Sequence, residues 1–309
     1  MAAKRDLVSM LDVEDDLVGI LVLAANIKNR TKAGEPYEPL RGKSLAMLFE
    51  KASTRTRVSF EVGMTQLGGN ALFLSPTDLQ IGRGETIADT ARVLSRYVDG
   101  IMYRAFRRDD VRELAANATV PVINGLDDKE HPCQIVADLL TIQERKGELK
   151  GLKLAYVGDG NNVCNSLLLG SAIVGMDMAA AVPKSYEPDG ELLSAARRLA
   201  KRTGSEIELV HDPAAAAKAS DVLYTDVWVS MGQEKEKAER EEIFRPYQIN
   251  RKLLDHAKPD AIVMHCLPAH RGLEITDDVM DGPHSVVFDQ AENRLHAQKA
   301  ILARFLAGE

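Results

Sequence analysis

The sequence predicts an α/β protein with two doubly wound parallel-sheet domains linked by interdomain helices. Three observations lead to this fold class. Short apolar runs alternate with amphipathic stretches along the whole chain, which is typical of strands and helices that build parallel sheets. The length of 309 residues suits about two domains. The segment 146–151, Lys-Gly-Glu-Leu-Lys-Gly, interrupts the pattern near the middle and provides a boundary.

The first predicted domain covers residues 1–147. A long helix is expected over 131–145, because Pro132 suits a first turn, apolar residues recur on one face, and Gly147 suits the helix end. Shorter helix-like stretches include 58–67 and 86–97. The candidate strands are the apolar runs 43–50, 70–74, 99–103 and 120–123.

The second predicted domain covers residues 148–309 and repeats this alternation. The alanine-rich stretch 213–219 predicts a helix, and the charged stretch 233–242 predicts a solvated helix or a loop. The last segment, about 291–307, is amphipathic, so we expect a helix that packs back on the first domain. The candidate strands are 152–157, 178–182, 207–210, 221–225, 261–265 and 285–288.

Composition and charge exclude several classes of protein. Lys and Arg number 39 against 46 Asp and Glu, so the net charge of −7 offers no basic field for nucleic acid. The strongest apolar run, 17–25, falls well short of the ~20 residues that span a bilayer, and the N-terminus has no signal-peptide pattern. Three cysteines without a Cys-x-x-Cys pair favour a reducing compartment. We expect a cytoplasmic protein without nucleic-acid or membrane partners.

The first segment that carries chemistry is 53–57, Ser-Thr-Arg-Thr-Arg, between a predicted strand and a predicted helix. A helix start offers N–H groups and the positive end of the helix dipole, and here it adds three hydroxyls and two guanidiniums. This combination favours a site for a phosphate dianion. The simplest alternative is a helix N-cap with surface arginines.

Two further segments lie where predicted strands and helices meet. His-Pro-Cys-Gln at 131–134 opens the long helix and is either a binding element or a helix cap. Gly158 and Gly160 follow a strand, as in a dinucleotide fingerprint, but Val163 stands in place of the third glycine and no acid closes the next strand. The asparagines of this segment suit an amino acid's carboxylate better than NAD.

Three single residues are candidates at other strand and helix ends. Asp226 follows a strand, where it can hold an ammonium group or cap a loop. For Cys266, beside His265, a zinc site, a Cys–His nucleophile pair and an inert buried thiol are all open, although zinc lacks enough well-spaced ligands. Arg294 is a second anion contact or a surface arginine.

Taken together and in this order, these segments resemble the carbamoyltransferase superfamily over essentially the whole chain. Ser-Thr-Arg-Thr-Arg and His-Pro-x-Gln are similar to its carbamoyl-phosphate signature. Asp-Gly-Asn-Asn, Ser-Met-Gly and His-Cys-Leu-Pro resemble the ornithine branch. The aspartate branch instead carries Pro-Leu-Pro-Arg near 266–269 and a lysine in the loop that corresponds to 75–90, which contains none here.

The resemblance implies transfer of a carbamoyl group from carbamoyl phosphate to the δ-amine of L-ornithine, giving L-citrulline and phosphate. It implies direct attack by the amine, without a covalent enzyme intermediate, a metal or another cofactor. It also implies a homotrimer with shared active sites, or a larger assembly of trimers. Carbamoyltransferases for acetylornithine, putrescine or aspartate remain the near alternatives, and a nonenzymatic dinucleotide- or anion-binding protein is the distant one.

The resemblance further implies which residues form the site. Arg104 and His131 would stabilise the oxyanion, and Asp226 and Cys266 would help to deprotonate the amine. Ornithine would be bound by Asn162, Asp226, Ser230 and Met231. Carbamoyl phosphate would be bound by Ser53, Thr54, Arg55, Thr56, Gln80 of a neighbouring subunit, Arg104, His131, Pro132, Cys133, Gln134, Cys266, Leu267 and Arg294.

Overall fold

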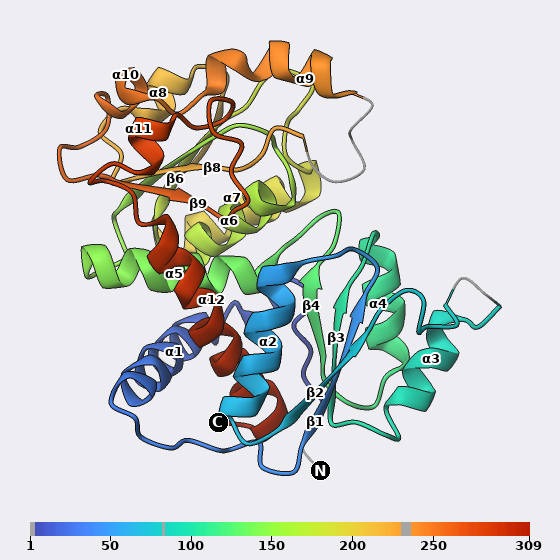
Figure 1. The fold of residues 1–309 in the computed structure, drawn as a ribbon. Helices are drawn as coiled ribbons and strands as arrows, with labels where there is room; N and C mark the ends of the chain where they lie inside the picture. The colour runs from blue at the N-terminus through green and yellow to red at the C-terminus, as the bar shows by residue number, and fades with distance from the viewer. Residues whose placement is uncertain (1–3, 82–83, 230–235) are drawn as a thin grey trace. The chain divides into compact units, whose positions relative to one another are not determined.

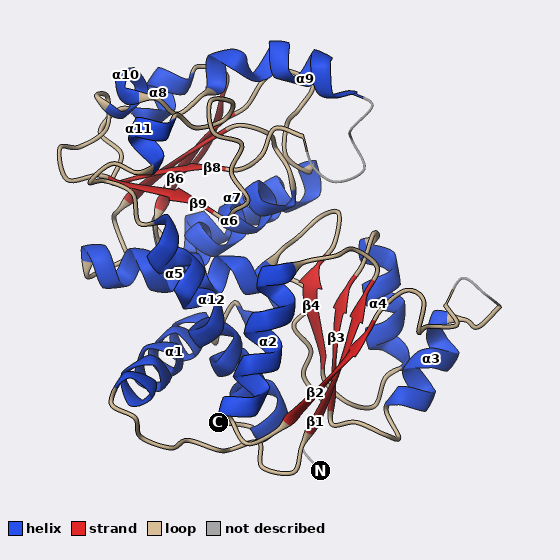
Figure 2. Cartoon of the chain, in the orientation of Figure 1, coloured by secondary structure: helices blue, strands red, loops and turns tan. Residues whose placement is uncertain are grey.

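The computed structural model describes residues 4–81, 84–229 and 236–309. The chain divides into two compact units, Met1–Leu140 with Glu292–Glu309, and Thr141–Ala291. Each unit is built around its own parallel sheet with helices beside it, which confirms the predicted fold class (Figures 1 and 2). Among the helices described, none is long and apolar enough to cross a membrane.

The first unit contains four parallel strands in the order β2-β1-β3-β4. β1 and β3 are buried along almost their whole length, which explains why they appear in the sequence as continuous apolar runs. The strand order reverses between β1 and β3, so their carboxyl ends flank the position where open α/β sheets bind ligands. The strands are β1 (Ser44–Phe49), β2 (Asn70–Leu74), β3 (Gly100–Arg104) and β4 (Val122–Leu126).

Helices cover both faces of this sheet. α3 and α4 pack together on one face, while α1 and α2 lie on the other (Figure 1). The last part of α12 and the short helix Ala303–Ala307 also belong to this unit. The helices are α1 (Leu17–Lys32), α2 (Thr54–Gln66), α3 (Ile87–Leu94), α4 (Arg108–Asn117), α5 (Pro132–Lys146) and α12 (Val287–Leu302).

The second unit contains five parallel strands in the order β7-β6-β5-β8-β9. Its strand order reverses between β5 and β8, which creates the same kind of switch point. The strands are β5 (Lys153–Val157), β6 (Asp177–Ala181), β7 (Ile207–Val210), β8 (Val222–Thr225) and β9 (Ile262–His265). The helices are α6 (Asn162–Val174), α7 (Gly190–Thr203), α8 (Pro213–Ala217), α9 (Lys237–Phe244), α10 (Arg251–Leu254) and α11 (Asp277–Met280).

One sequence prediction about the last ninety residues was wrong. The strand expected at 285–288 is a single bridge between Ser285 and Val263, and α12 already begins at Val287. The apolar run there is the first turn of a helix, because Gln290 N–H donates to the carbonyl of Val286. In the charged stretch 233–242, residues 233–235 lie outside the described residues. The rest belongs to a mostly exposed helix, as predicted, although Arg240 on this helix is buried.

A buried lysine in the first unit leads to a prediction about stability. Lys299 on α12 is 3% exposed, and its Nζ donates to Thr31 Oγ1 at 2.8 Å and to Gln66 Oε1 at 2.9 Å. Burial lowers the pKa of this ammonium to about 8. In the unfolded chain a lysine has its ordinary pKa of about 10.4. Between about pH 8 and pH 10.4 the unfolded chain therefore binds more protons than the folded protein. The free energy of unfolding rises with pH over this range.

We therefore expect Lys299→Met to raise the free energy of unfolding relative to wild type most strongly at pH 7. This difference should shrink by on the order of 2–3 kcal/mol as the pH approaches 10.5. Urea unfolding between pH 7 and pH 10.5 measures it. Lys32→Met, at an exposed position on α1, is the control and should show no such trend. A difference for Lys299→Met that does not change with pH would contradict the prediction.

Candidate active site

The first unit presents an anion site at the carboxyl end of β1. Ser53 is the N-cap of α2, and its Oγ accepts a hydrogen bond from the backbone N–H of Thr56 at 3.3 Å. Thr54, Arg55 and Thr56 form the first turn, so the helix starts four residues before the predicted stretch 58–67. The exposed helix start thus offers backbone N–H groups and a positive dipole end to an anion.

The two arginines of this segment point to different surroundings. Arg55 contributes to the positive field at His131. Arg57 instead pairs with Glu61 at 3.1 Å and lies over the ring of Phe73, 3.6 Å from its centroid. Arg57 is therefore engaged away from His131, whereas Arg55 adds to the positive field there.

Three arginines are close enough to the buried His131 to affect its pKa. Burial lowers its pKa well below the usual range, and Arg294, Arg104 and Arg55 lower it further. The imidazole is therefore neutral near pH 7 and can donate one N–H beside three cations. Such a concentration of positive charge in a buried place suits a bound anion and a developing oxyanion.

Arg294 is held by residues from two other helices. Its Nη2 donates to Thr56 Oγ1 at 3.1 Å, and its Nη1 donates to Gln134 Oε1. Gln134 in turn donates to the buried Asp138 at 2.8 Å, a residue that the sequence did not single out. The structure therefore brings together Thr56 at the start of α2, Gln134 at the start of α5 and Arg294 on α12.

Pro132, Cys133 and Gln80 are the other candidate residues of the first unit. Pro132 is the first residue of α5. Cys133 is buried, donates to the carbonyl of Asn124 at 3.3 Å, and has its pKa raised to about 12 by burial. Its thiol therefore ties α5 to β4. Gln80 is exposed in the loop after β2, next to residues 82–83, which lie outside the described residues.

The second unit gathers polar groups at the carboxyl ends of β5, β8 and β9. Asp226 is 6% exposed and accepts three hydrogen bonds. Its Oδ2 accepts from Asn161 Nδ2 at 2.8 Å, and its Oδ1 accepts from the N–H of Val227 at 2.8 Å and from Cys266 Sγ at 3.0 Å. Strand ends that are distant in the sequence thus converge on one carboxylate.

Asn161 is the functional candidate that the sequence prediction missed. It caps α6, because its Oδ1 accepts from the N–H groups of Val163 and Cys164, while its Nδ2 reaches Asp226. Asn162, the predicted ligand, is the half-buried first residue of the helix. The signal was available, since an asparagine directly before a helix is a common N-cap. Ser230 and Met231 lie outside the described residues.

The turn after β5 contains Gly158 and Gly160, and close packing requires the second of these glycines. A Cβ at Gly160 would lie 2.4 Å from the backbone of Tyr186 and Pro188, so the neighbouring loop demands a glycine there. Val163, at the third position of the fingerprint, is a buried helix residue. The turn therefore gives no support to the dinucleotide alternative.

The potential metal-ligand atoms of Asp226, His265 and Cys266 lie within 4.8 Å of one another. The zinc site considered from the sequence would need a ring nitrogen of His265 that is free to bind the ion. His265 Nδ1, however, accepts from the N–H of Leu267 at 2.9 Å, and Nε2 lies 3.2 Å from Glu274 Oε1. Both ring nitrogens are thus engaged within the protein. This donor set fits a hydrogen-bonded thiol better than a cation.

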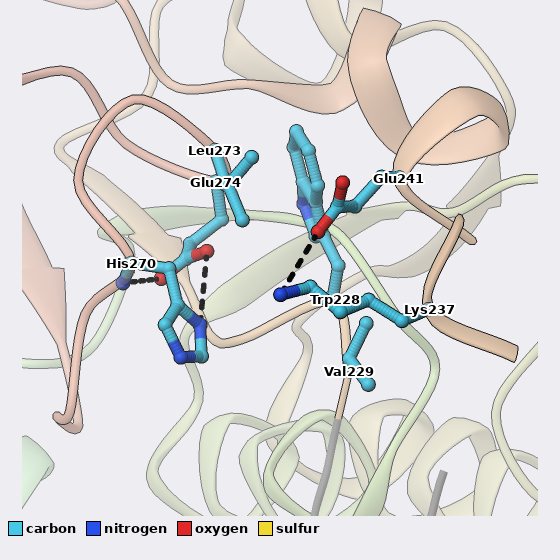
Figure 3. A pocket seen from close by; sticks show the side chains of 7 residues that line it. All are labelled: Trp228, Val229, Lys237, Glu241, His270, Leu273 and Glu274. Atoms are coloured by element: carbon cyan, nitrogen blue, oxygen red, sulfur yellow. Dashed lines mark hydrogen bonds and ion pairs between the residues drawn. The ribbon is translucent and has the colours of Figure 1, made fainter. Parts of the chain in front are cut away.

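A small pocket in the second unit lies next to these groups (Figure 3). His270 and Glu274 face Trp228, Lys237 and Glu241 across it. The buried Arg240 donates from Nε to the backbone carbonyl of Trp228 at 2.6 Å, and its guanidinium pairs with Asp159. α9 is therefore anchored to the loops after β5 and β8.

Comparison with known proteins covers both units. Residues 5–144 match the family profile "Aspartate/ornithine carbamoyltransferase, carbamoyl-P binding domain", and residues 150–305 match the Asp/Orn binding domain of the same family. An ornithine carbamoyltransferase of Methanoculleus marisnigri is 58% identical, over 99% of this chain and 98% of that protein. The Pyrococcus furiosus relative named "Ornithine carbamoyltransferase, anabolic" is also 58% identical, over 99% and 98%. A solved ornithine carbamoyltransferase structure from Pyrococcus furiosus superimposes with a TM-score of 0.97 at 57% identity, covering 99% of this chain and 98% of that one.

Proposed function

The chain belongs to the aspartate/ornithine carbamoyltransferase family and is therefore a transferase, and we propose that it moves the carbamoyl group of carbamoyl phosphate to the δ-amine of L-ornithine. The products are L-citrulline and phosphate. The observation that carries the proposal is the meeting of three segments in the first unit, where Arg294 donates to Thr56 Oγ1 at the start of α2 and to Gln134 Oε1 at the start of α5. The name of the anabolic Pyrococcus relative further supports a role in arginine biosynthesis. The cytoplasmic location stays a prediction.

Carbamoyl phosphate binds to the first unit in this proposal. The phosphate group accepts hydrogen bonds from the start of α2, where Ser53, Thr54 and Thr56 add hydroxyls and Arg55 adds charge. Arg104 and the neutral His131 donate to the carbonyl oxygen. Both become stronger partners as that oxygen gains negative charge, so they lower the barrier.

Gln134 and Arg294 hold the other end of the carbamoyl group. Gln134 accepts from the carbamoyl nitrogen, and Arg294 adds positive charge near the bond that breaks. Pro132 and Cys133 act through the position of α5. Cys266 and Leu267 supply groups near the carbamoyl carbon, as the family resemblance implies.

The amine substrate binds to the second unit. Asp226 faces the α-ammonium group of ornithine, with Asn162, Ser230 and Met231 as the further ligands. The nucleophile is the δ-amine. A free alkylamine has a pKa near ~10, so the δ-amine must lose a proton before it can attack. Asp226 and Cys266 help to remove that proton in this proposal, which the hydrogen bond of 3.0 Å between them supports. The neutral amine then attacks the carbonyl carbon directly, and phosphate leaves without a covalent enzyme intermediate.

One assay tests the proposed function against the near alternatives. Purified protein is supplied with carbamoyl phosphate and, separately, with L-ornithine, acetylornithine, putrescine or L-aspartate. We expect citrulline from ornithine and little product from the other amines. Samples quenched during turnover should show no carbamoyl mass on Cys266. Faster use of another amine, or release of phosphate without citrulline, contradicts the proposal.

We also propose a homotrimer whose subunits share active sites, alone or within a larger assembly. β2 lies at the edge of its sheet. Apolar side chains around it are exposed: Val58 at 50%, Val62 at 38% and Leu72 at 51%. Gln80 is in the loop that follows this strand. An exposed apolar patch next to an open strand edge favours contact with another chain.

Shared sites predict that two inactive variants rescue each other. Gln80→Ala and Arg104→Ala subunits are dissociated, mixed and reassembled. In mixed trimers, some sites combine an intact Arg104 from one chain with an intact Gln80 from its neighbour, so activity should return in part. Native mass spectrometry verifies mixing. Mixed trimers no more active than either parent would rule out the shared site.

A further inference from the structure

Glu274 is a buried acid near Asp226 and Cys266, and it has no part in the chemistry proposed above. Glu274 is 0% exposed and lines the pocket of Figure 3. Its Oε1 accepts from the backbone N–H of His270 and lies 3.2 Å from Nε2 of His265, which is also 0% exposed. We propose that Glu274 is a positioning residue for Cys266, acting through His265. Its effect on turnover rests on the proposed function.

The location of the proton on His265 follows from its two neighbours. The backbone N–H of Leu267 approaches Nδ1 at 2.9 Å. Because a backbone N–H is always a donor, Nδ1 is the acceptor, and the one proton of the neutral ring lies on Nε2. Nε2 therefore donates to Glu274. The carboxylate thus fixes both the tautomer and the orientation of the ring.

The ring in turn holds the backbone around Cys266. Leu267 has a φ of +61°, in the left-handed region that residues other than glycine rarely adopt without contacts to hold them there. The bond from its N–H to His265 Nδ1 spans the turn, with Cys266 in the middle. In this turn Cys266 Sγ donates to Asp226 Oδ1 at 3.0 Å.

Loss of the acid has a definite consequence for this turn. Without Glu274, the ring can rotate or adopt the other tautomer, whose Nδ1–H would face the N–H of Leu267. Two donors repel each other, so the turn relaxes and Sγ moves away from Asp226. The amine site then loses the hydrogen-bonded pair that we place next to the attacking nitrogen.

The reactivity of Cys266 measures this positioning independently of turnover. Cys133 and Cys164 are 0% exposed, whereas Cys266 is half-buried. Alkylation proceeds through the thiolate, so a thiol whose proton is held by a carboxylate reacts slowly. We expect Glu274→Ala to raise the rate of iodoacetamide labelling at Cys266 about tenfold, as followed by peptide mass spectrometry.

The same variant should lose turnover while keeping the first unit intact. We expect kcat for citrulline to fall about 10- to 100-fold, because small displacements of reacting groups are costly. The Kd for carbamoyl phosphate should change by only a few-fold, because its phosphate ligands all belong to the first unit. Glu274→Gln keeps an acceptor oxygen in place of Oε1. Its labelling rate at Cys266 and its kcat should therefore both lie within about threefold of wild type.

Asp221→Ala is the matched control. Asp221 is a buried carboxylate directly before β8, at the opposite end of the same sheet, and it pairs with Lys258 at 2.8 Å. Its loss should lower stability without changing the labelling of Cys266. Should Glu274→Ala fail to fold, Glu274→Asp keeps the charge, withdraws the carboxylate by ~1.5 Å, and should also speed labelling.

Two results would overturn the proposal. One is wild-type labelling rates in Glu274→Ala, or in Glu274→Asp if that variant is used. The other is an equal increase in Asp221→Ala, which would indicate general loosening of the unit. If the labelling rates change as expected but the wild type makes no citrulline, the proposed function fails and the positioning of Cys266 by Glu274 stands.

Discussion

Replacing Arg55 with alanine is expected to weaken carbamoyl-phosphate binding about 100-fold, because charge-assisted hydrogen bonds to a buried anion are worth about 1.5–3 kcal/mol. Arg55 lies in the first turn of α2, where backbone N–H groups and the helix dipole already favour an anion. It is also one of the three cations that lower the pKa of His131. The variant should therefore lose affinity for inorganic phosphate as well, which isothermal titration measures directly.

The same segment provides the control. Arg57 is two residues away but pairs with Glu61 and covers the ring of Phe73. Arg57→Ala should bind carbamoyl phosphate within a few-fold of wild type, provided that native mass spectrometry shows the same assembly. Equal losses in the two variants would mean that charge near α2 matters and the position of Arg55 does not.

This contrast shows what the sequence could and could not predict about the site. Successive residues of a helix are about 100° apart, so positions 55 and 57 point in nearly opposite directions once the helix begins at Thr54. The prediction started the helix near Val58, and the two arginines then appeared equivalent. An error of four residues in a helix boundary thus concealed that the two guanidiniums have different surroundings.

The central strands were predictable because both of their faces are covered in a parallel sheet, so each is an apolar run with little alternation. β2 and β7 are edge strands and partly exposed, yet their apolar runs also predicted the bounds that the structure has. The same property explains the wrong strand at 285–288. Val286, Val287 and Phe288 form an apolar run too short for periodicity to separate a strand from a helix start.

Contacts across loops could not be predicted. Glu274 meets His265 through eight intervening residues with no regular pattern, and only the folded loop brings the two side chains together. Asp226 and Cys266 were predicted singly from the ends of different strands. That they share a hydrogen bond depends on the adjacency of β8 and β9, which the sequence does not encode locally.

Asp226→Asn should reduce kcat/KM for ornithine more strongly than any other change in the second unit. The carboxylate accepts from Asn161, from the N–H of Val227 and from Cys266. An amide removes the negative charge that, in the proposed function, faces the ammonium. It also turns its NH₂ toward one of these donors, and Asn161 cannot invert its own amide without giving up the cap of α6. Removing one partner of a buried charge pair costs about 2–5 kcal/mol, so a loss of about 100-fold or more is expected.

The loss should be confined to the amine substrate. Most of the proposed carbamoyl-phosphate ligands belong to the first unit, so the Kd for carbamoyl phosphate should change by only a few-fold. Asp221→Asn is the matched control, since this buried acid precedes the same strand at its other end and pairs with Lys258. It should change stability and leave kcat/KM nearly unaltered. Steady-state kinetics with ornithine varied, together with titration of carbamoyl phosphate, separates these effects. Equal damage to both substrates would show that Asp226 supports the fold of the site and does not recognise the amine.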